Sequence, residues 1–160
     1  MSYHISEIQP ADDKTICNII KSVGIEHGAV GEGFGPSDPE VECMSSHYNG
    51  NNNSRYLVAK IDGRVVGGGG IAPFNGSSET CELRKLFLLP ESRGFGIGKA
   101  LTEQCLDYAK SQGYLHCYLD TLSAMKPAIK LYENAGFRHL AQPLAGTIHG
   151  SCDVWMLKEL

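Results

Sequence analysis

Apolar and polar residues alternate with two different periods along the chain, and each period predicts one kind of secondary structure. Two-residue alternation and β-branched or aromatic runs predict strands over residues 3–9, 55–61, 64–74, 80–90, 114–122, 137–142 and 151–160. Helical spacing predicts helices over residues 10–28, 39–49, 96–113 and 123–136. The resulting order is βααβββαβαββ, which indicates a mixed α/β fold.

Glycine and proline mark the boundaries of these elements. Asp62-Gly63 is a strong short-turn dipeptide between two β-rich runs and predicts a hairpin. Gly113 ends one helical stripe, and Gly136 ends the next. Pro127 is tolerated only in the first turn of that last helix. Because no internal repeat or long linker interrupts the pattern, we expect a single domain over residues 1–160.

Composition narrows the class of protein. Of the 160 residues 42% are apolar and 20% are charged, and the net charge is −4, as in soluble globular proteins. No run of Lys and Arg stands out, which argues against nucleic acid as the main ligand. No apolar run reaches membrane-spanning length, and the N-terminal residues do not resemble a secretory signal. We therefore expect a cytoplasmic protein with no membrane partner.

Six cysteines stand at positions 17, 43, 81, 105, 117 and 152. They form no CxxC pair and no Cys/His cluster with zinc spacing. Several lie inside apolar runs, where a thiol behaves as a small hydrophobic group. We therefore expect reduced thiols and no metal site.

A glycine-rich segment over residues 93–99 lies between a predicted strand and a predicted helix, an arrangement that suits a phosphate. A Walker A loop needs Ser or Thr after Gly-Lys, but alanine follows Gly98-Lys99. The dinucleotide fingerprint GxGxxG follows the first strand of a βαβ unit. Here the spacing is GxGxG, and the segment comes late in the chain. Both of these phosphate loops are therefore disfavoured.

A third pattern, R/Q-x-x-G-x-G/A, is matched by Arg93, Gly96 and Gly98. Its glycines let the backbone approach a ligand closely and aim several N–H groups at one point. The start of the following helix adds its dipole, so a pyrophosphate is held with little side-chain charge. The segment therefore predicts a pyrophosphate-binding loop.

Neighbouring motifs give this loop its context. Upstream stands ELRKLFLLPE over residues 82–91, and downstream stands AIKLYENAGF over residues 128–137. Together with DGRVVGGGGI over residues 62–71, the chain resembles the GNAT superfamily of N-acetyltransferases. The resemblance implies a single domain with a mixed, mostly antiparallel central sheet and flanking helices. It also implies acetyl-CoA as the co-substrate.

The resemblance also implies a set of cofactor-binding residues. The backbone of Leu86, Phe87 and Leu88 would pair with the pantetheine arm, because the fourth strand of this family carries a bulge and diverges from the fifth. The pyrophosphate would be held by Arg93, Gly94, Phe95, Gly96, Ile97, Gly98 and Lys99. Met125 and Tyr132 complete the expected contacts. Met125 replaces the asparagine of many family members, so Thr121, Ser123 or the backbone would make that contact here.

The same resemblance implies catalytic roles. An amine must lose a proton before it attacks a thioester, the tetrahedral oxyanion needs a donor, and the leaving thiolate needs a proton. The donor would be the backbone N–H of Leu88, and the acid would be Tyr132, which is protonated at an ordinary pKa of about 10. Two residues compete for the role of general base. Glu82 at the start of the fourth strand is preferred over Asp120 at the end of the fifth, and Glu32 and His47 are weaker candidates.

The acceptor would lie between residues 28–40 and residues 143–153, where Glu32, Asp38, His149 and Asp153 are polar candidates. We therefore expect acetyl transfer from acetyl-CoA to a primary amine. The acceptor is a small molecule or a peptide or protein, and the enzyme is a monomer or a homodimer. The alternative is a non-catalytic acyl-CoA-binding or regulatory module. The sequence does not identify the acceptor.

Overall fold

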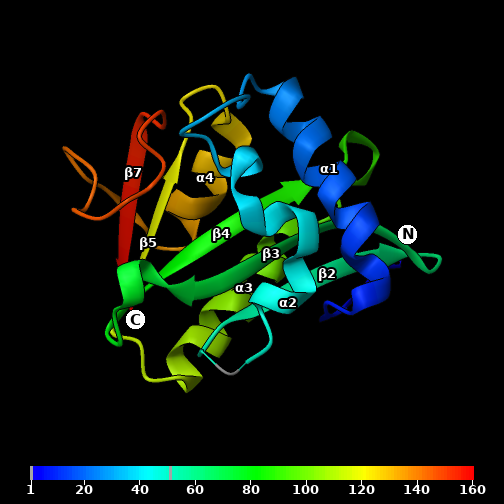
Figure 1. Cartoon of the computed structure of the whole chain (residues 1–160), viewed down its shortest axis with the longest axis horizontal. Coiled ribbons are helices and arrows are strands. Elements are labelled where there is room, and N and C mark those ends of the chain that lie inside the picture. The colour runs from blue at the N-terminus through cyan, green and yellow to red at the C-terminus, as the bar shows by residue number, and fades with distance from the viewer. Residues whose placement is uncertain (1, 51) are drawn as a thin grey trace.

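One sheet of seven strands organises the molecule (Figure 1), and the computed structural model describes residues 2–50 and 52–160 of it. Met1 and Asn51 lie outside the described residues. The strands are β1 (His4–Glu7), β2 (Arg55–Ile61), β3 (Arg64–Pro73), β4 (Thr80–Leu88), β5 (His116–Thr121), β6 (Arg138–His139) and β7 (Val154–Glu159). Their order across the sheet is β1-β2-β3-β4-β5-β7-β6. Among the strands of the described residues, β4 and β5 pair in parallel, and the other five pairings are antiparallel.

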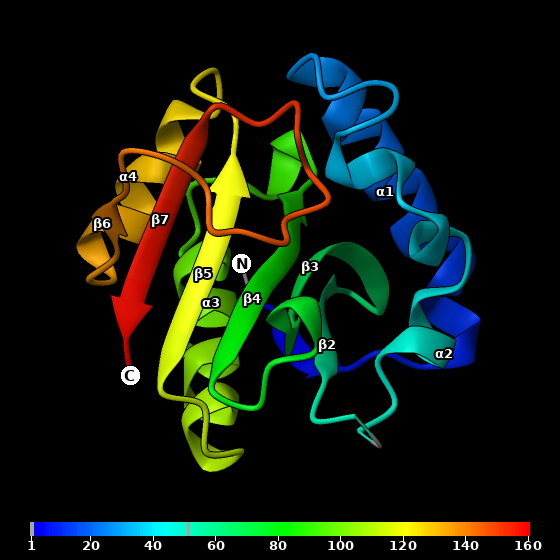
Figure 2. The ribbon, with the colours of Figure 1, turned by 60° about the vertical axis from the view of Figure 1, so that its left-hand side comes forward.

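Helices cover both faces of the sheet (Figures 1 and 2). They are α1 (Asp13–Glu26), α2 (Met44–His47), α3 (Ile97–Ser111) and α4 (Lys126–Asn134). One apolar core joins α3 and α4 to the sheet, and a second core joins α1 and α2 to its other face. Among the described residues, no helix is both long and apolar enough to cross a membrane. The observed order βααβββαβαββ confirms the predicted mixed α/β fold.

Several predicted boundaries were wrong, and three of them have a clear physical cause. The second helix is interrupted at Cys43, whose backbone is not helical, so a 3₁₀ segment (Pro39–Cys43) precedes the short α2. The strand expected over residues 137–142 is limited to β6, and the chain then leaves the sheet in a loop that contains Pro143, which has no N–H for a ladder. The last helix begins at Lys126, three residues later than Ser123, whose amide and hydroxyl are bonded to Asp153.

A bulge in β4 opens the sheet. Lys85 has φ +51°, and the β3–β4 register shifts between Gly68 and Gly70. The hydroxyl of Tyr56 donates a hydrogen bond of 2.7 Å to the carbonyl of Lys85 and holds the bulge in place. A Cβ at either Gly68 or Gly70 would come within 2.6 Å of the Tyr56 ring, so only glycine leaves room for this ring on β3.

The strands β4 and β5 then diverge. They pair only from Thr80 to Glu82, although β4 continues to Leu88. The edge of β4 beyond Glu82 is therefore free of its neighbour, as the family resemblance implied.

Candidate active site

A cleft of about 310 Å³ runs along the part of β4 that β5 does not cover. Its walls come from the ends of α1 and β4, the glycine-rich segment and the start of α4. They are formed by Val23, His27, Leu86, Phe87, Leu88, Arg93, Gly94, Gly96, Ile97, Gly98, Lys99, Met125, Pro127, Ala128 and Leu131. We call this space the long cleft. Of the residues expected to bind the cofactor, all but Phe95 and Tyr132 lie in its walls.

The glycine-rich segment meets the long cleft at the N-terminus of α3. Gly94 and Gly96 have φ of +86° and +82°, a conformation that costs other residues about 1–2 kcal/mol. A Cβ at either position would meet no atom within 4 Å, so open space lies in front of both glycines. The first N–H groups of α3 have no acceptor within the helix and are available to an anion.

Arg93 fastens this segment to its surroundings. Its guanidinium donates to both carboxylate oxygens of Glu26, at 2.7 and 2.8 Å, and to the carbonyl of Leu88, at 2.9 and 3.2 Å. The hydrogen bonds from Arg93 lower the pKa of Glu26. The positive charge of Arg93 is therefore already shared with a protein carboxylate.

The backbone of Leu88 faces the space that β5 leaves. The N–H of Leu89 donates to the carbonyl of Val66 on β3, at 2.9 Å. Successive N–H groups of an extended strand point to opposite edges, so the N–H of Leu88 points away from β3. This orientation fits the oxyanion-donor role expected for Leu88.

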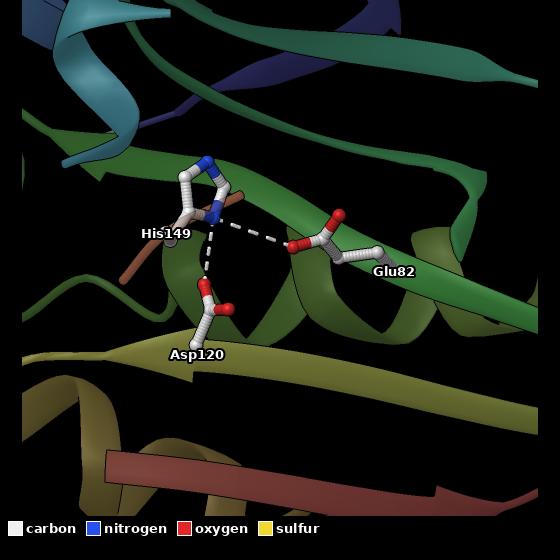
Figure 3. Close-up of side chains that lie close together, drawn as sticks. All are labelled: Glu82, Asp120 and His149. Atoms are coloured by element: carbon white, nitrogen blue, oxygen red, sulfur yellow. Dashed lines mark hydrogen bonds and ion pairs between the residues drawn. The ribbon is translucent and has the colours of Figure 1, made fainter. Parts of the chain in front are cut away.

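Glu82, Asp120 and His149 meet at the point where β4 and β5 diverge (Figure 3). Nδ1 of His149 lies 2.8 Å from Oδ1 of Asp120 and 3.5 Å from Oε2 of Glu82. All three side chains are at least 93% buried. We call this group the acidic cluster. The structure thus brings together the two candidate bases and a histidine expected on the acceptor side.

Each member of the acidic cluster is held by a further partner. Nε2 of His149 lies 2.7 Å from Oδ2 of Asp38, and Oδ2 of Asp120 accepts from the Thr147 hydroxyl at 2.5 Å. Nε of Arg84 donates to Oε1 of Glu82 at 2.7 Å. These contacts fix the orientation of both carboxylates and of the imidazole ring.

The acidic cluster favours a charged imidazole. Burial would lower the pKa of His149, but its hydrogen bonds with Asp120 and Asp38 raise that pKa to about 11. Burial would likewise raise the pKa of Asp38, but hydrogen bonds from His149 and Lys85 hold it below its usual value. His149 is therefore an imidazolium between carboxylates at neutral pH.

The same three residues could also form a metal site. One ligand atom each from Glu82, Asp120 and His149 lies within 4.8 Å of the others, which is close enough for a metal ion. A metal ligand, however, needs a free ring nitrogen. Both nitrogens of His149 already contact carboxylates, and this arrangement fits a proton on each nitrogen.

A second, smaller pocket of about 60 Å³ adjoins the acidic cluster. Its lining combines the end of β5, the middle of β4 and two loops. It is formed by Ala29, Phe34, Gly35, Pro36, Glu82, Leu83, Arg84, Lys85, Phe87, Asp120, Thr121, Leu122, Met125, His149 and Cys152. We call it the small pocket. Phe87 and Met125 belong to the walls of both spaces, so the small pocket lies next to the long cleft.

Tyr132 is not brought together with the candidate bases. Its side chain is 6% exposed, its ring packs edge-on against Phe137 with centroids 6.0 Å apart, and it lines neither space. Burial raises the pKa of its hydroxyl further above the ordinary value, and Cys105 and Cys117 add to this shift. The role of Tyr132 as the acid therefore stays a prediction.

The remaining sequence candidates lie at different distances from the cluster. Asp38 and His149 belong to it or bind it directly, whereas Asp153 is bonded to Ser123. His47 borders a separate hollow on the α2 side. The hydroxyls of Thr121 and Ser123, expected to replace the usual asparagine, donate to Met125 Sδ and to Asp153.

Sequence reasoning missed Arg84 and Lys85. Nζ of Lys85 lies 2.7 Å from Oδ2 of Asp38, and its side chain is 2% exposed. The signal was present: two consecutive cations stand in an otherwise apolar strand segment, and buried cations need buried anions.

Comparison with known proteins decides the family. Residues 27–137 match the acetyltransferase (GNAT) family. The chain belongs to the GNAT family of acetyltransferases. It is 40% identical over 151 residues to the uncharacterized N-acetyltransferase YjgM of Escherichia coli. The alignment covers 93% of this chain and 90% of that protein. The sequence-based expectation of an acetyl-CoA-dependent acyltransferase is thereby confirmed at the level of the family.

Solved structures agree on the GNAT fold. The GNAT acetyltransferase from Staphylococcus aureus Mu50 superposes with a TM-score of 0.85, 20% identity and 99% coverage of both chains. The acetyltransferase yncA from Salmonella typhimurium, solved with its cofactor acetyl-CoA, superposes with a TM-score of 0.78 and 22% identity over 100% of this chain and 95% of that one. At these identities the likeness shows the fold of this GNAT protein and not its acceptor.

Proposed function

We propose that this GNAT protein transfers the acetyl group of acetyl-CoA to a primary amine by direct attack. One observation carries the proposal: the long cleft, which includes the glycine-rich segment, shares Phe87 and Met125 with a pocket lined by two buried carboxylate side chains, Glu82 and Asp120. The solved relative that contains acetyl-CoA has the same fold, which supports the cofactor. The long cleft would hold the cofactor, and the small pocket would receive the amine.

Backbone groups would hold the cofactor. The uncovered edge of β4 from Leu86 to Leu88 offers main-chain partners for the pantetheine amides, as an added strand would use them. The N-terminus of α3 with Gly94 and Gly96 would take the pyrophosphate. Arg93 is already bonded to Glu26 at 2.7 and 2.8 Å. Lys99, whose side chain is 74% exposed and lies 4.0 Å from Glu103, is the more available cation.

Glu82 is the proposed general base, and Asp120 is the alternative. Both carboxylates line the small pocket, which shares Phe87 and Met125 with the long cleft. Oε2 of Glu82 is 3.5 Å from His149 Nδ1, whereas Oδ1 of Asp120 is only 2.8 Å from it. The Oε2 atom of Glu82 is therefore the more weakly bonded oxygen, which supports Glu82 over Asp120 as the base.

The remaining steps use the backbone and a hydroxyl. The N–H of Leu88 would stabilise the oxyanion of the tetrahedral intermediate, because it points to the uncovered edge of β4. Tyr132 would protonate the leaving thiolate, and this role requires its hydroxyl to reach the long cleft from the core. The amine nitrogen forms a bond to the acetyl carbon, the carbon–sulfur bond breaks, and coenzyme A leaves as the thiol.

Thiol release tests the proposal directly. The purified protein with acetyl-CoA and a panel of amines should release free thiol at a rate that depends on the amine. Calorimetry should show coenzyme A binding more tightly than ATP or NAD. If coenzyme A binds but no amine in the panel causes thiol release, the result supports the alternative, a non-catalytic acyl-CoA-binding module.

A further inference from the structure

Two loops meet above the small pocket. The 27–43 loop joins α1 to α2, and the 140–153 loop joins β6 to β7. Figure 2 shows the 140–153 loop crossing β5 to reach the end of β4 before it returns to β7. The amide of Ser151 donates to the carbonyl of Gly33 at 3.2 Å, and the Ser151 hydroxyl donates to the carbonyl of Glu32 at 3.3 Å. The contact between His149 and Asp38 joins the same two loops.

The closed loops leave little room for an acceptor. The small pocket measures about 60 Å³, and a cavity needs roughly 10–15 Å³ to hold one water-sized group. A few non-hydrogen atoms therefore fit, such as an amino group at the end of a short alkyl chain. A peptide N-terminus brings a substituted α-carbon and a backbone, so it would enter only if the two loops separated.

The charges around the small pocket are shared and leave an excess of anions. Four buried or half-buried carboxylates belong to Asp38, Glu40, Glu82 and Asp120. Three cationic groups face them: Arg84 and Lys85 each contact two of the carboxylates, and His149 contacts three. Arg84 contacts Glu82 and Glu40, at 2.7 and 3.4 Å.

The other two cations are used in the same way. Lys85 contacts Asp38 and Glu40, at 2.7 and 3.6 Å. His149 contacts Asp38, Asp120 and Glu82, at 2.7, 2.8 and 3.5 Å. Among the described residues that line the pocket, every cation is thus engaged by carboxylates. An acceptor carboxylate would meet no unengaged partner, whereas an acceptor ammonium would balance the remaining negative charge.

We propose that the acceptor is a small aliphatic amine with an unbranched carbon beside its nitrogen and no neighbouring carboxylate, and that His149 enforces this choice by holding the two loops together. This inference rests on the proposed acetyl transfer. In the reaction the ammonium loses two protons and gains the acetyl group. One proton accompanies the thiol of coenzyme A, and the other passes through the base to solvent.

Matched acceptors test the chemical class. Propylamine and 2-aminobutyrate have the same carbon chain apart from the carboxylate beside the amine. We expect kcat/KM for propylamine to exceed that for 2-aminobutyrate by at least 10-fold. A tetrapeptide with an N-terminal alanine should react at least 100-fold more slowly than propylamine. A 2-aminobutyrate rate equal to or above that of propylamine, or a comparable peptide rate, would overturn the proposal.

Variants test the part played by His149. His149→Ala should lower kcat/KM for propylamine at least 10-fold, because the loops lose their shared ion pair. It should also reduce the ratio of kcat/KM for propylamine to kcat/KM for the tetrapeptide. His149→Gln keeps the size of the side chain but not its charge, and it should narrow the same ratio. The control is His139→Ala, which removes an exposed histidine that contacts Glu133 and should leave the ratio unchanged. An unchanged ratio in both His149 variants, with coenzyme A binding intact, would contradict the role.

Different results would contradict the proposed acetyl transfer and the proposed acceptor class. If some amine is acetylated but amino acids or peptides are preferred, the acceptor class is wrong and the acetyl transfer stands. If coenzyme A binds and no acceptor of any class is acetylated, both proposals are wrong.

Discussion

His149 Nε2 lies 2.7 Å from Oδ2 of Asp38, although 111 positions separate the two residues in the sequence. The other ring nitrogen lies 2.8 Å from Asp120 at the end of β5. One imidazolium therefore ties two loops and the sheet together at the point where the proposed acceptor enters.

The contacts of His149 with Asp38 and Asp120 predict a pH-dependent contribution to the stability of the folded protein. The pKa of His149 is about 11 in the folded protein and 6.5 ordinarily, so folding binds a proton between these values. The stabilisation is fully present below about pH 6.5 and is lost as the pH rises toward 11. His149→Gln should lower the free energy of unfolding by roughly 3 kcal/mol at pH 6. In urea titrations the difference from the wild type should shrink steadily at pH 8 and pH 10, and a difference that grows with pH would contradict the assignment.

Substitution of two glycines should distinguish an effect on stability from an effect on coenzyme A binding. Gly96→Ala places a side chain at φ +82°, which should cost about 1–2 kcal/mol of stability. It should also weaken coenzyme A binding at least 10-fold in calorimetry, because the backbone can no longer approach the pyrophosphate. Gly76→Ala is the matched control. Gly76 has φ +73° and the same open space, but it lies in the turn before β4, so this variant should lose stability without losing affinity. If Gly96→Ala and Gly76→Ala bind coenzyme A with equal affinity, the glycine-rich segment is not part of the cofactor site.

Tyr132→Phe removes one hydroxyl and keeps the ring in the core. If Tyr132 protonates the thiolate, kcat should fall by roughly 10²-fold or more, with coenzyme A affinity unchanged. Tyr114→Phe is the control, since it removes a core tyrosine hydroxyl that donates to the carbonyl of Asn53. A Tyr132→Phe enzyme as active as the control would assign that tyrosine to packing alone, in keeping with its burial.

Removal of metal ions distinguishes the two interpretations of the acidic cluster. With an imidazolium at its centre, dialysis against EDTA should leave the rate of thiol release unchanged. A lost rate that Zn²⁺ or Mn²⁺ restores, and that His149→Gln abolishes, would instead make Glu82, Asp120 and His149 metal ligands.

Local patterns predicted the order of elements well, because each element carries its own signals. The Asp62-Gly63 turn has both residues at positive φ, as its dipeptide suggested, and Gly113 follows directly on the last turn of α3. The glycine-rich segment could be placed at a helix N-terminus for the same reason, since strand, loop and helix are contiguous in the sequence.

The acidic cluster could be predicted only in part. Glu82 and Asp120 stand at definable positions on neighbouring strands, so the resemblance to the family identified both. His149 and Asp38 were only two of several polar loop residues, because a loop of irregular backbone has no period that fixes where its side chains point. Lys85 was missed because the bulge in β4 changes which residues share a face, and the bulge depends on Tyr56 from another strand.

In the proposed reaction, Glu82 removes the proton of an amine that attacks acetyl-CoA in the small pocket. The most direct measurement supplies acetyl-CoA labelled with ¹³C in its acetyl group, together with propylamine, and compares wild type with Glu82→Gln, Asp120→Asn and the surface control Glu79→Gln. We expect wild type and control to form labelled N-propylacetamide in an amount equal to that of the thiol. We expect the Glu82→Gln rate to be at least 10²-fold lower than that of wild type or of the control. No labelled amide from the wild type, or a Glu82→Gln rate equal to that of the control, would contradict it.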